Sequence, residues 1–303
     1  MKLAAFLRLI RWENLLLLLY IQLLLKFLFF PSFNATTTLS IFQFFIFVLA
    51  LLFVTVAGYI FNDINDLKTD LINKPHKVIV SKFISTESAQ HLYLITNTLG
   101  IVFGIVLSLS IQKPSYSFIF IGASLLLYFY SKKLKSKPLI GNIAVSFLVA
   151  TSIIILYFFD INDETQNDSQ KLVIYVIGLL SCFAFFLSLI REIVKDIEDV
   201  NGDYSLKMNT LPILIGVKRA KKIAAFLCLF PLMLLLVIIV NYASIYKFTV
   251  LYLGSFTLLP LLYVFIKLFS AKTKSDFKRL SLFLKLIMFF GMNSLLILSL
   301  NTY

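Results

Sequence analysis

Long apolar runs separated by short polar segments fill most of the chain. The runs are continuous and do not alternate with polar residues, which favours helices over a β-barrel. A helix that crosses a bilayer needs about 20 mostly apolar residues. The pattern therefore predicts an all-α polytopic membrane protein with nine transmembrane helices, forming one domain over residues 1–303. The nine expected spans are Leu15–Phe30, Ile41–Phe61, Leu92–Ile111, Tyr116–Tyr130, Leu139–Phe159, Leu172–Ile190, Ile223–Val240, Phe248–Phe269 and Leu282–Leu300.

Composition supports this interpretation. Hydrophobic residues make up 60% of the chain and charged residues 14%, and the mean hydropathy is +0.93. Too few polar side chains are present to cover a surface that faces water. A soluble globular protein is therefore excluded.

The net charge of +13, from 28 Lys and Arg against 15 Asp and Glu, has an uneven distribution. Most of the cations fall in alternate connecting segments, and the opposite connections hold only Lys113, Lys171 and Lys247. Cytoplasmic loops are enriched in Lys and Arg. We therefore expect a cytoplasmic N-terminus and an outer C-terminus, with the cell (inner) membrane as the location. This topological bias accounts for the charge without a nucleic-acid partner.

Eight of the 15 acidic residues lie in two short stretches, 61–70 and 191–203, each directly after an expected span on the cytoplasmic side. In both stretches three aspartates are spaced by three and then four residues. On a helix that continues from the membrane, this spacing places all three carboxylates on one face. The aspartates are Asp63, Asp66 and Asp70 in the first stretch and Asp196, Asp199 and Asp203 in the second.

Like charges on one helix face need a neutralising partner. A solvated helix end is the simplest explanation for one such stretch, but it explains less well a repeat of the same spacing. Mg²⁺ prefers oxygen ligands and is usually held by one or two carboxylates together with substrate phosphates. Cations suited to phosphate oxygens lie close by in the sequence. They are Lys74 and Lys77 after the first stretch and Arg191 and Lys195 in the second. The pattern predicts a Mg²⁺-diphosphate site.

Other sites fit less well. A calcium loop counted from Asp63 would place Lys68 where glycine is required and Lys74 where glutamate is required. The acidic segment 160–164 has no repeat partner, and we expect it to be a solvated outer loop. Cys182 and Cys228 lie in apolar runs, so we expect buried packing residues there.

Two other membrane functions remain as alternatives. A transporter would place ionisable groups near the bilayer midplane, whereas the acids here follow the ends of spans. A transferase acting on CDP-activated lipids would have a DG-led acidic signature, whereas Gly202 precedes Asp203 in this chain.

The paired stretches resemble the motifs of the UbiA-type superfamily of intramembrane prenyltransferases. Asn62, Asp63, Asp66 and Asp70 match the NDxxDxxxD motif of that family, and residues 195–203 resemble its second aspartate motif. Further similarity covers most of the chain. It includes Arg11-Trp12-Glu13-Asn14, which looks like the RPxN motif, and Tyr130-Ser131 with Lys135, Pro138, Gly141 and Asn142, which look like the fourth loop and fifth helix entrance.

The resemblance implies nine helices around a central cavity, two Mg²⁺ ions, a prenyl diphosphate and a lipophilic acceptor in the bilayer. It implies that the six aspartates bind metal, with Asp66 and Asp199 essential for catalysis. Tyr130 is a candidate to stabilise an allylic cation. Asn62 is a candidate contact of the diphosphate. Asn14 is expected either to position a substrate or to form an interfacial hydrogen bond, and Lys135 either to contact phosphate or to act as a topogenic lysine.

The acceptor is indicated only by resemblance. The segments Asn62–Asp66 and Asn73–Pro75 look most like the branch related to geranylgeranylglycerol-phosphate geranylgeranyltransferases. An aromatic quinone precursor is the alternative acceptor.

Overall fold

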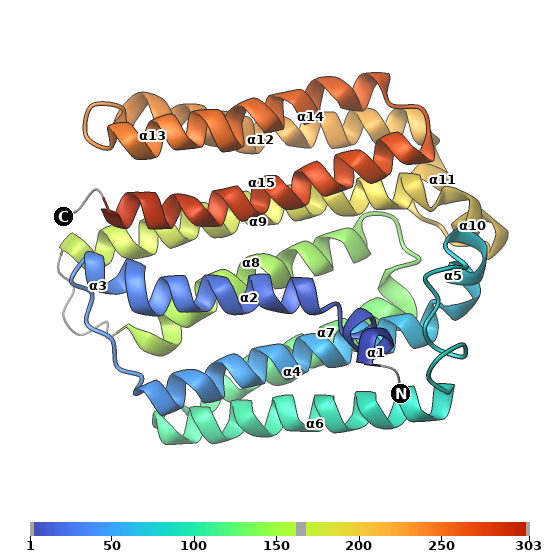
Figure 1. Ribbon diagram of the computed structural model, residues 1–303, viewed down its shortest axis with the longest axis horizontal. Coiled ribbons are helices and arrows are strands. Elements are labelled where there is room, and N and C mark those ends of the chain that lie inside the picture. The colour runs from blue at the N-terminus through green and yellow to red at the C-terminus, as the bar shows by residue number, and fades with distance from the viewer. Residues whose placement is uncertain (1–2, 162–167, 301–303) are drawn as a thin grey trace. The chain divides into compact units, whose positions relative to one another are not determined.

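The protein is described by a computed structural model that covers residues 3–161 and 168–300, and these residues are mostly helical (Figure 1). The α-helices are α1 (Leu3–Leu9), α2 (Trp12–Leu24), α3 (Phe30–Ser32), α4 (Ile41–Asn65), α5 (Leu67–Asn73), α6 (Thr86–Ser110), α7 (Ser117–Phe129), α8 (Ile140–Asp160), α9 (Asp168–Glu198), α10 (Val200–Ser205), α11 (Leu211–Ile215), α12 (Val217–Tyr242), α13 (Lys247–Leu253), α14 (Leu259–Ser270) and α15 (Lys274–Leu300). Three π-helical segments interrupt or extend them: η1 (Leu25–Phe29), η3 (Tyr130–Leu134) and η4 (Gly254–Leu258).

Eight helical stretches in the described part of the chain are long and apolar enough to cross a membrane. They correspond to eight of the nine expected spans, which confirms an all-α polytopic architecture. The remaining expected span, Tyr116–Tyr130, contains the 13-residue helix α7. A 3₁₀ turn, η2 (Pro114–Tyr116), precedes α7, and η3 follows it. The count of nine and the direction of insertion stay predictions.

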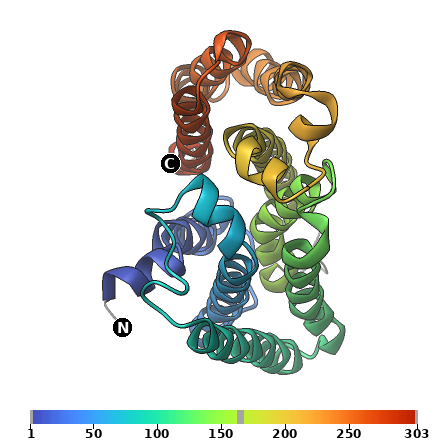
Figure 2. The same cartoon turned by 90° about the vertical axis from the view of Figure 1, so that its right-hand side faces the viewer.

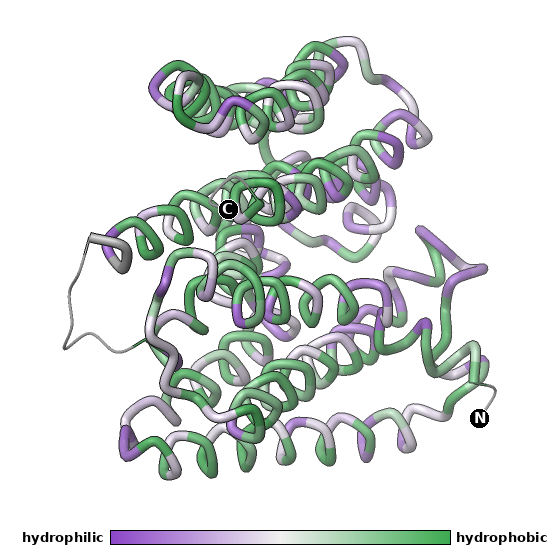
Figure 3. The backbone as a smooth tube through the Cα atoms, turned by 60° about the vertical axis from the view of Figure 1, so that its left-hand side comes forward, coloured by the Kyte–Doolittle hydropathy of each residue, from purple (hydrophilic) through white to green (hydrophobic). Residues whose placement is uncertain are grey.

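Apolar residues run along the lengths of the helices, and hydrophilic residues gather at the helix ends and connections (Figure 3). Many large apolar side chains face outward. Phe42, Phe118 and Val240, for example, each expose 71–76% of their surface. An aqueous protein rarely exposes so much apolar surface, so we assign these faces to contact with lipid.

The described contacts divide the chain into two compact units. Unit 1 contains Met1–Tyr20, Leu39–Lys137 and Asn201–Lys207, and unit 2 contains Ile21–Thr38, Pro138–Val200 and Met208–Tyr303. The division passes through α2 and falls directly after Val200, inside the second acidic stretch. The expectation of one domain over the whole chain stays a prediction.

Unit 1 is organised around α4, α6 and α7, and α4 and α6 run side by side (Figures 1 and 2). Glycines permit the close approach of these helices. A Cβ atom at Gly100 would lie 2.8 Å from the backbone nitrogen of Val54, and one at Gly104 would lie 2.4 Å from the ring of Phe120. Small residues of this kind let membrane helices gain packing contacts between their backbones. This packing fixes the end of α4, where the first aspartate stretch begins.

Unit 2 is organised around α9, which packs against α8, α12 and α15. Its buried face includes Leu187, Ile190 and Val194, none of which exposes more than 1% of its surface. Cys228 is buried, as expected, but Cys182 is exposed. The expectation for Cys182 is wrong because this residue lies on a face of α9 away from the buried one.

The expectation of a solvated acidic loop at 160–164 is wrong at Asp160, and its other residues from 162 onward lie outside the described residues. Asp160 is fully buried and ends α8. Lys26 in η1 donates a 2.9 Å hydrogen bond to it, and only 7% of Lys26 is exposed. The backbone N–H of Thr38 also donates to the carbonyl oxygen of Asp160, at 2.7 Å. Because an unpaired charge is costly in a low-dielectric environment, the lysine inside the first span accounts for the buried acid.

Unit 2 also holds an apolar pocket of about 110 Å³, lined by residues such as Phe183, Leu235, Leu253 and Leu295. Phe183 precedes Asp196 by more than three turns on α9. The pocket therefore lies more than three turns of α9 away from Asp196, and we do not assign it a role in the chemistry of the second aspartate stretch.

Candidate active site

Both aspartate stretches lie where a long helix ends and a short helix begins. In the first stretch α4 ends at Asn65, α5 begins at Leu67, and Asp66 lies between them. In the second stretch α9 ends at Glu198, α10 begins at Val200, and Asp199 lies between them. The expectation of one uninterrupted helix face is thus wrong in detail. The chain bends at the middle aspartate of each stretch, and the two stretches share this local plan.

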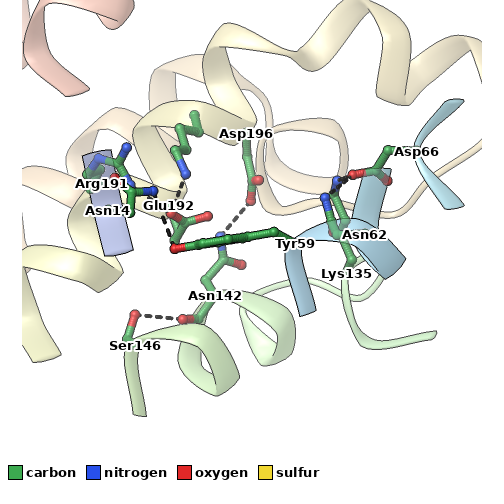
Figure 4. Close-up of polar contacts among 11 residues, drawn as sticks. Asn14, Tyr59, Asn62, Asp66, Lys135, Asn142, Ser146, Arg191, Glu192 and Asp196 are labelled. Carbon is green, nitrogen blue, oxygen red and sulfur yellow. Dashed lines mark hydrogen bonds and ion pairs between the residues drawn. The ribbon is translucent and has the colours of Figure 1, made fainter. Parts of the chain in front are cut away.

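The bend at Asp66 keeps the helical hydrogen-bonding pattern on both sides. The Asp66 N–H donates to the Asn62 carbonyl at 2.8 Å, and the Asp70 N–H donates to the Asp66 carbonyl at 2.8 Å. The carboxylate of Asp66 does not cap α5. Its oxygen Oδ2 accepts instead from Asn62 Nδ2, at 2.6 Å, and from Lys135 Nζ (Figure 4). The middle aspartate of the first stretch is therefore held by side chains and not used for capping.

The first stretch is a buried electrostatic cluster. Asp66 exposes 6% of its surface, and Arg11 Nη2 donates to Asp63 Oδ1 at 2.9 Å. Burial alone would lower the pKa of Lys135, but Asp66, Tyr130 and Asp70 together outweigh burial and raise it. Burial, followed by the negative charge of Asp66, raises the pKa of Asp70. Lys135 therefore stays protonated among carboxylates.

A π-helical turn leads to the lysine that pairs with Asp66. Tyr130 begins η3, and the Lys135 N–H donates to the Tyr130 carbonyl at 3.0 Å, five residues back. Such π-turns widen a helix locally and are frequent at functional sites. Tyr130 is only partly buried. Lys135 thus lies at the first stretch and contacts Asp66, and its contact with phosphate stays a prediction.

The second stretch has its own hydrogen bonds, within unit 2. Asn142 Nδ2 donates to Asp196 Oδ2 at 2.8 Å (Figure 4). Asn142 lies in the first turn of α8, and its carbonyl accepts from Ser146 Oγ at 2.7 Å. This contact orients the carboxylate of Asp196.

The two cations expected in the second stretch share a glutamate. Lys195 Nζ lies 2.6 Å from Glu192 Oε1, and Arg191 Nη1 lies 3.3 Å from the same oxygen. Glu192 itself exposes 9% of its surface. Arg191 and Lys195 are therefore gathered at one carboxylate, next to Asp196 in the sequence.

The last aspartate of the second stretch belongs to unit 1. Asp203 lies on α10 and exposes 5% of its surface. The neighbouring Gly202 donates its backbone N–H to Asn73 Oδ1 at 3.0 Å. Asn73 is the last residue of α5, three positions after Asp70. Figure 1 shows α5 and α10 next to each other.

The other expected contact residues differ in how they are connected to the first aspartate stretch. Asn14 Nδ2 donates to the Tyr59 hydroxyl at 3.3 Å, and the Arg11 guanidinium lies 4.6 Å from the centre of the Tyr59 ring. The Lys74 N–H donates to the Asp70 carbonyl at 2.8 Å and so ends α5. Lys77 is exposed in the following turn. Lys74 is thus bonded to the first stretch directly, and Asn14 is linked to Asp63 through Tyr59 and Arg11.

Several residues at the site were not expected to be functional. Four of them, Arg11, Tyr59, Asn142 and Glu192, each contact an expected site residue. The fifth, Asn73, accepts from the backbone of Gly202, next to Asp203. Arg11, Asn73 and Asn142 lie within the segments that carry the family resemblance, which was the available signal. Tyr59 had no sequence signal.

The donor set suits a hard cation. In the ranges 3–161 and 168–300, no group of three or more His, Cys, Asp or Glu side chains is close enough to hold a metal ion by itself. Mg²⁺ does not require such a group, because it keeps several waters and takes further ligands from substrate phosphates. The aspartates of the two stretches offer oxygen ligands only, which matches the preference of Mg²⁺.

Comparison with known proteins gives consistent results. A digeranylgeranylglyceryl phosphate synthase of Methanobrevibacter smithii is 38% identical over 177 residues, which cover 58% of this chain and 60% of that protein. The chain thus aligns with about three fifths of the length of this curated relative. A solved structure described as providing insights into digeranylgeranylglyceryl phosphate synthase in membranes covers 98% of both chains, with 24% identity and a TM-score of 0.65.

A second solved structure, of a UbiA homologue from Archaeoglobus fulgidus bound to GPP and Mg²⁺, covers 96% of this chain and 99% of that one. Its identity is 16% and its TM-score 0.56, so the likeness shows a shared fold. The model of the UbiA prenyltransferase family matches residues 23–291, which include both aspartate stretches and parts of both units. The chain therefore belongs to the UbiA prenyltransferase family.

Proposed function

We propose that this protein transfers a prenyl group from a prenyl diphosphate to a lipophilic acceptor within the membrane, in a reaction that requires Mg²⁺. The observation that carries the proposal is the repeated plan of the two aspartate stretches, in which the middle aspartate stands between a long apolar helix and a short one. Membership in the UbiA prenyltransferase family supports the same reaction.

The proposed ligands of two Mg²⁺ ions are the six aspartates, Asp63, Asp66, Asp70, Asp196, Asp199 and Asp203. Mg²⁺ prefers octahedral coordination, so three carboxylates for each ion would leave positions for water and for diphosphate oxygens. Bound Mg²⁺ would neutralise the charge that develops on the leaving diphosphate. The boundary between the units falls between Val200 and Asn201, so the chain itself carries the second stretch from one unit into the other.

The cations of the site are the proposed contacts of the diphosphate. Lys135 stays protonated beside Asp66, and Arg11 holds Asp63. Together with Asn62, Lys74, Lys77, Arg191 and Lys195, they would bind phosphate oxygens by charge-assisted hydrogen bonds. We assign Asn14 to positioning of the substrate through its contact with Tyr59.

The transfer breaks the allylic carbon–oxygen bond of the prenyl diphosphate, and the bonding electron pair leaves with the diphosphate. The acceptor hydroxyl oxygen forms the new carbon–oxygen bond and releases its proton. Positive charge develops on the allylic carbons during this exchange, and the face of an aromatic ring stabilises such charge. We assign that role to Tyr130, five residues before Lys135.

The proposed acceptor is a lipid of the geranylgeranylglycerol-phosphate type. It is supported by the 38% identity to a protein named digeranylgeranylglyceryl phosphate synthase. The resemblance of the segments Asn62–Asp66 and Asn73–Pro75 to the same branch of the family supports it too.

We also propose a nine-span topology in the cell membrane, with the N-terminus and the active site on the cytoplasmic side. The helical residues of η2, α7 and η3 are contiguous from Pro114 to Leu134 and would provide the additional crossing. The distribution of Lys and Arg supports the orientation.

The acceptor is tested by a competition assay. Purified protein in lipid nanodiscs is incubated with Mg²⁺, isotopically labelled C10 to C20 prenyl diphosphates, and equal amounts of geranylgeranylglyceryl phosphate and 4-hydroxybenzoate. We expect the labelled prenyl ether of the glycerol-phosphate lipid and one diphosphate released per product. Formation of prenylated hydroxybenzoate alone would contradict the proposed acceptor. If no prenylated product forms and no diphosphate is released, the proposed reaction itself is contradicted.

A further inference from the structure

The backbone N–H of Gly202 is bonded to a side chain from a distant part of the sequence. It donates to Asn73 Oδ1 at 3.0 Å, across 129 residues, and this hydrogen bond is buried. The N–H belongs to the first turn of α10, which begins at Val200. Amides of a first helical turn have no acceptor within the helix and need one from outside. Asn73 therefore caps α10 from α5.

Gly202 leaves space for this contact. A Cβ atom at Gly202 would lie 2.4 Å from Asn73 Nδ2 and 2.5 Å from Asn73 Cγ. Gly202 is helical and does not have a positive φ, so its backbone conformation does not require glycine. Glycine is unfavourable inside a helix compared with alanine. The close approach of Asn73 is a physical reason for glycine at this position.

The residue that usually caps a helix by its side chain is the one before its first residue, which here is Asp199. A capping aspartate accepts a hydrogen bond from the second or third N–H of the helix. The third N–H of α10 is that of Gly202, and its acceptor is Asn73. Asp66, which holds the equivalent place before α5, makes no side-chain capping hydrogen bond.

We infer that Asn73 is a positioning residue that caps α10 from α5, and that it thereby holds Asp203 beside the helix of Asp70 for the metal-diphosphate complex. The inference rests on the proposed function. The helices α5 and α10 have seven and six residues, too few to be stable without tertiary contacts. The hydrogen bond between Asn73 and Gly202 is such a contact, and it joins the two short helices that carry Asp70 and Asp203, the last aspartates of the two stretches.

Two variants separate the hydrogen bond from the steric fit. Asn73→Leu keeps the size of the side chain and removes the acceptor, and Asn73→Asp keeps an acceptor oxygen in the same place. Gly202→Ala introduces the Cβ atom that collides with Asn73. The matched control is Asn201→Ala, because Asn201 is exposed and precedes Gly202 on the same short helix.

The first measurement is hydrogen–deuterium exchange of the peptide that contains residues 200–206, in protein without metal or substrate. We expect Asn73→Leu and Gly202→Ala to exchange about tenfold faster than wild type, the effect expected for the loss of one hydrogen bond. Asn73→Asp and Asn201→Ala should retain wild-type protection. This readout needs no enzyme activity, so it decides the capping even if the proposed function fails. Unchanged protection in Asn73→Leu would overturn the inference.

The second measurement is the Mg²⁺ concentration that half-saturates binding of inorganic diphosphate, by calorimetry. We expect it to rise about tenfold in Asn73→Leu and to stay within twofold of wild type in Asn73→Asp and Asn201→Ala. Loss of exchange protection without a change in Mg²⁺ requirement would limit Asn73 to a structural contact and overturn its positioning role. No binding of Mg²⁺ and diphosphate by wild type would contradict the proposed function and this role together. Thermal melting of each variant identifies any that fails to fold, and Gly202→Ala then replaces Asn73→Leu.

Discussion

The Lys135 amine and the Asp66 carboxylate, 69 residues apart in the chain, form an ion pair at the first aspartate stretch. The pair places a fixed positive charge on a proposed metal ligand. If Asp66 binds Mg²⁺ as proposed, Mg²⁺ and Lys135 would compete for this carboxylate until a diphosphate offers the lysine another anion. Such competition would favour joint binding of metal and diphosphate over binding of metal alone.

Replacement of Lys135 by methionine should have opposite effects on the two ligands. Without the competing cation, we expect Mg²⁺ alone to bind about tenfold more tightly, whereas inorganic diphosphate should bind at least about tenfold more weakly in the presence of Mg²⁺. Calorimetric titrations of each ligand measure both values. Lys137→Met, which removes an exposed charge two residues away, is the control and should change neither by more than about twofold. Weaker binding of Mg²⁺ alone in Lys135→Met would contradict the competition.

Asn142 should affect the Mg²⁺ requirement because it orients the carboxylate of Asp196. Replacement by leucine removes the donor to Asp196, and outer partners of metal ligands typically contribute roughly 10- to 100-fold in metal affinity or activity. We expect Asn142→Leu to raise the Mg²⁺ concentration for half-maximal turnover by about tenfold. Ser146→Ala, which leaves the Asn142 side chain in place, should have little effect. Equal Mg²⁺ requirements in the two variants would show that Asn142 does not position Asp196.

The ion pair between Lys26 and Asp160 should contribute to stability without a role in the reaction. Lys26→Met leaves a buried carboxylate without its cation, which typically costs about 3–5 kcal/mol. The double variant Lys26→Met/Asp160→Asn removes both charges and should recover most of that loss. Thermal or denaturant unfolding in detergent measures the difference. If the double variant is as unstable as Lys26→Met, the buried charge is not the cause.

The proposed orientation predicts which loops a membrane-impermeant thiol reagent reaches. In a background with Cys182→Ser and Cys228→Ser, a cysteine at Lys137 should be labelled only after the cytoplasmic face is opened. A cysteine at Ser115, at the other end of α7, should be labelled in intact cells. Both residues are exposed, Ser115 in η2 and Lys137 in the bend before α8. The reverse pattern would overturn the orientation, and labelling of both from one side would contradict a crossing by α7.

The apolar pattern predicted the helical architecture well, because each span needs a long unbroken apolar run. The segment Tyr116–Tyr130 was less clear, since the π-helical turn that extends α7 as far as Leu134 cannot be recognised from hydropathy. The bend at Asp66 also could not be predicted from the sequence. Spacing by three and four describes a regular helix, whereas Asn62 and Lys135 hold the Asp66 carboxylate at a helix junction.

Contacts between residues that lie far apart in the chain were the main source of error. Asp160 was expected to be solvated because its pairing with Lys26 crosses 134 residues. Asn73 was part of a recognised segment, but its bond to Gly202 depends on the packing of α5 with α10. The scarcity of acids drew attention to the two stretches, whose role in the chemistry stays a prediction, and tertiary contacts determine how each carboxylate is held.

The most direct test of the central claim is mass spectrometry of the products formed by purified protein from a labelled C20 prenyl diphosphate and geranylgeranylglyceryl phosphate. Wild type with Mg²⁺ should form the prenyl ether. Excess EDTA should abolish it, and Asp66→Asn and Asp199→Asn should each lower the rate by more than about a hundredfold, because each removes a metal-ligand charge. Product formation that persists in EDTA, or in either variant at the wild-type rate, would contradict the claim that both aspartate stretches bind the metal-diphosphate complex.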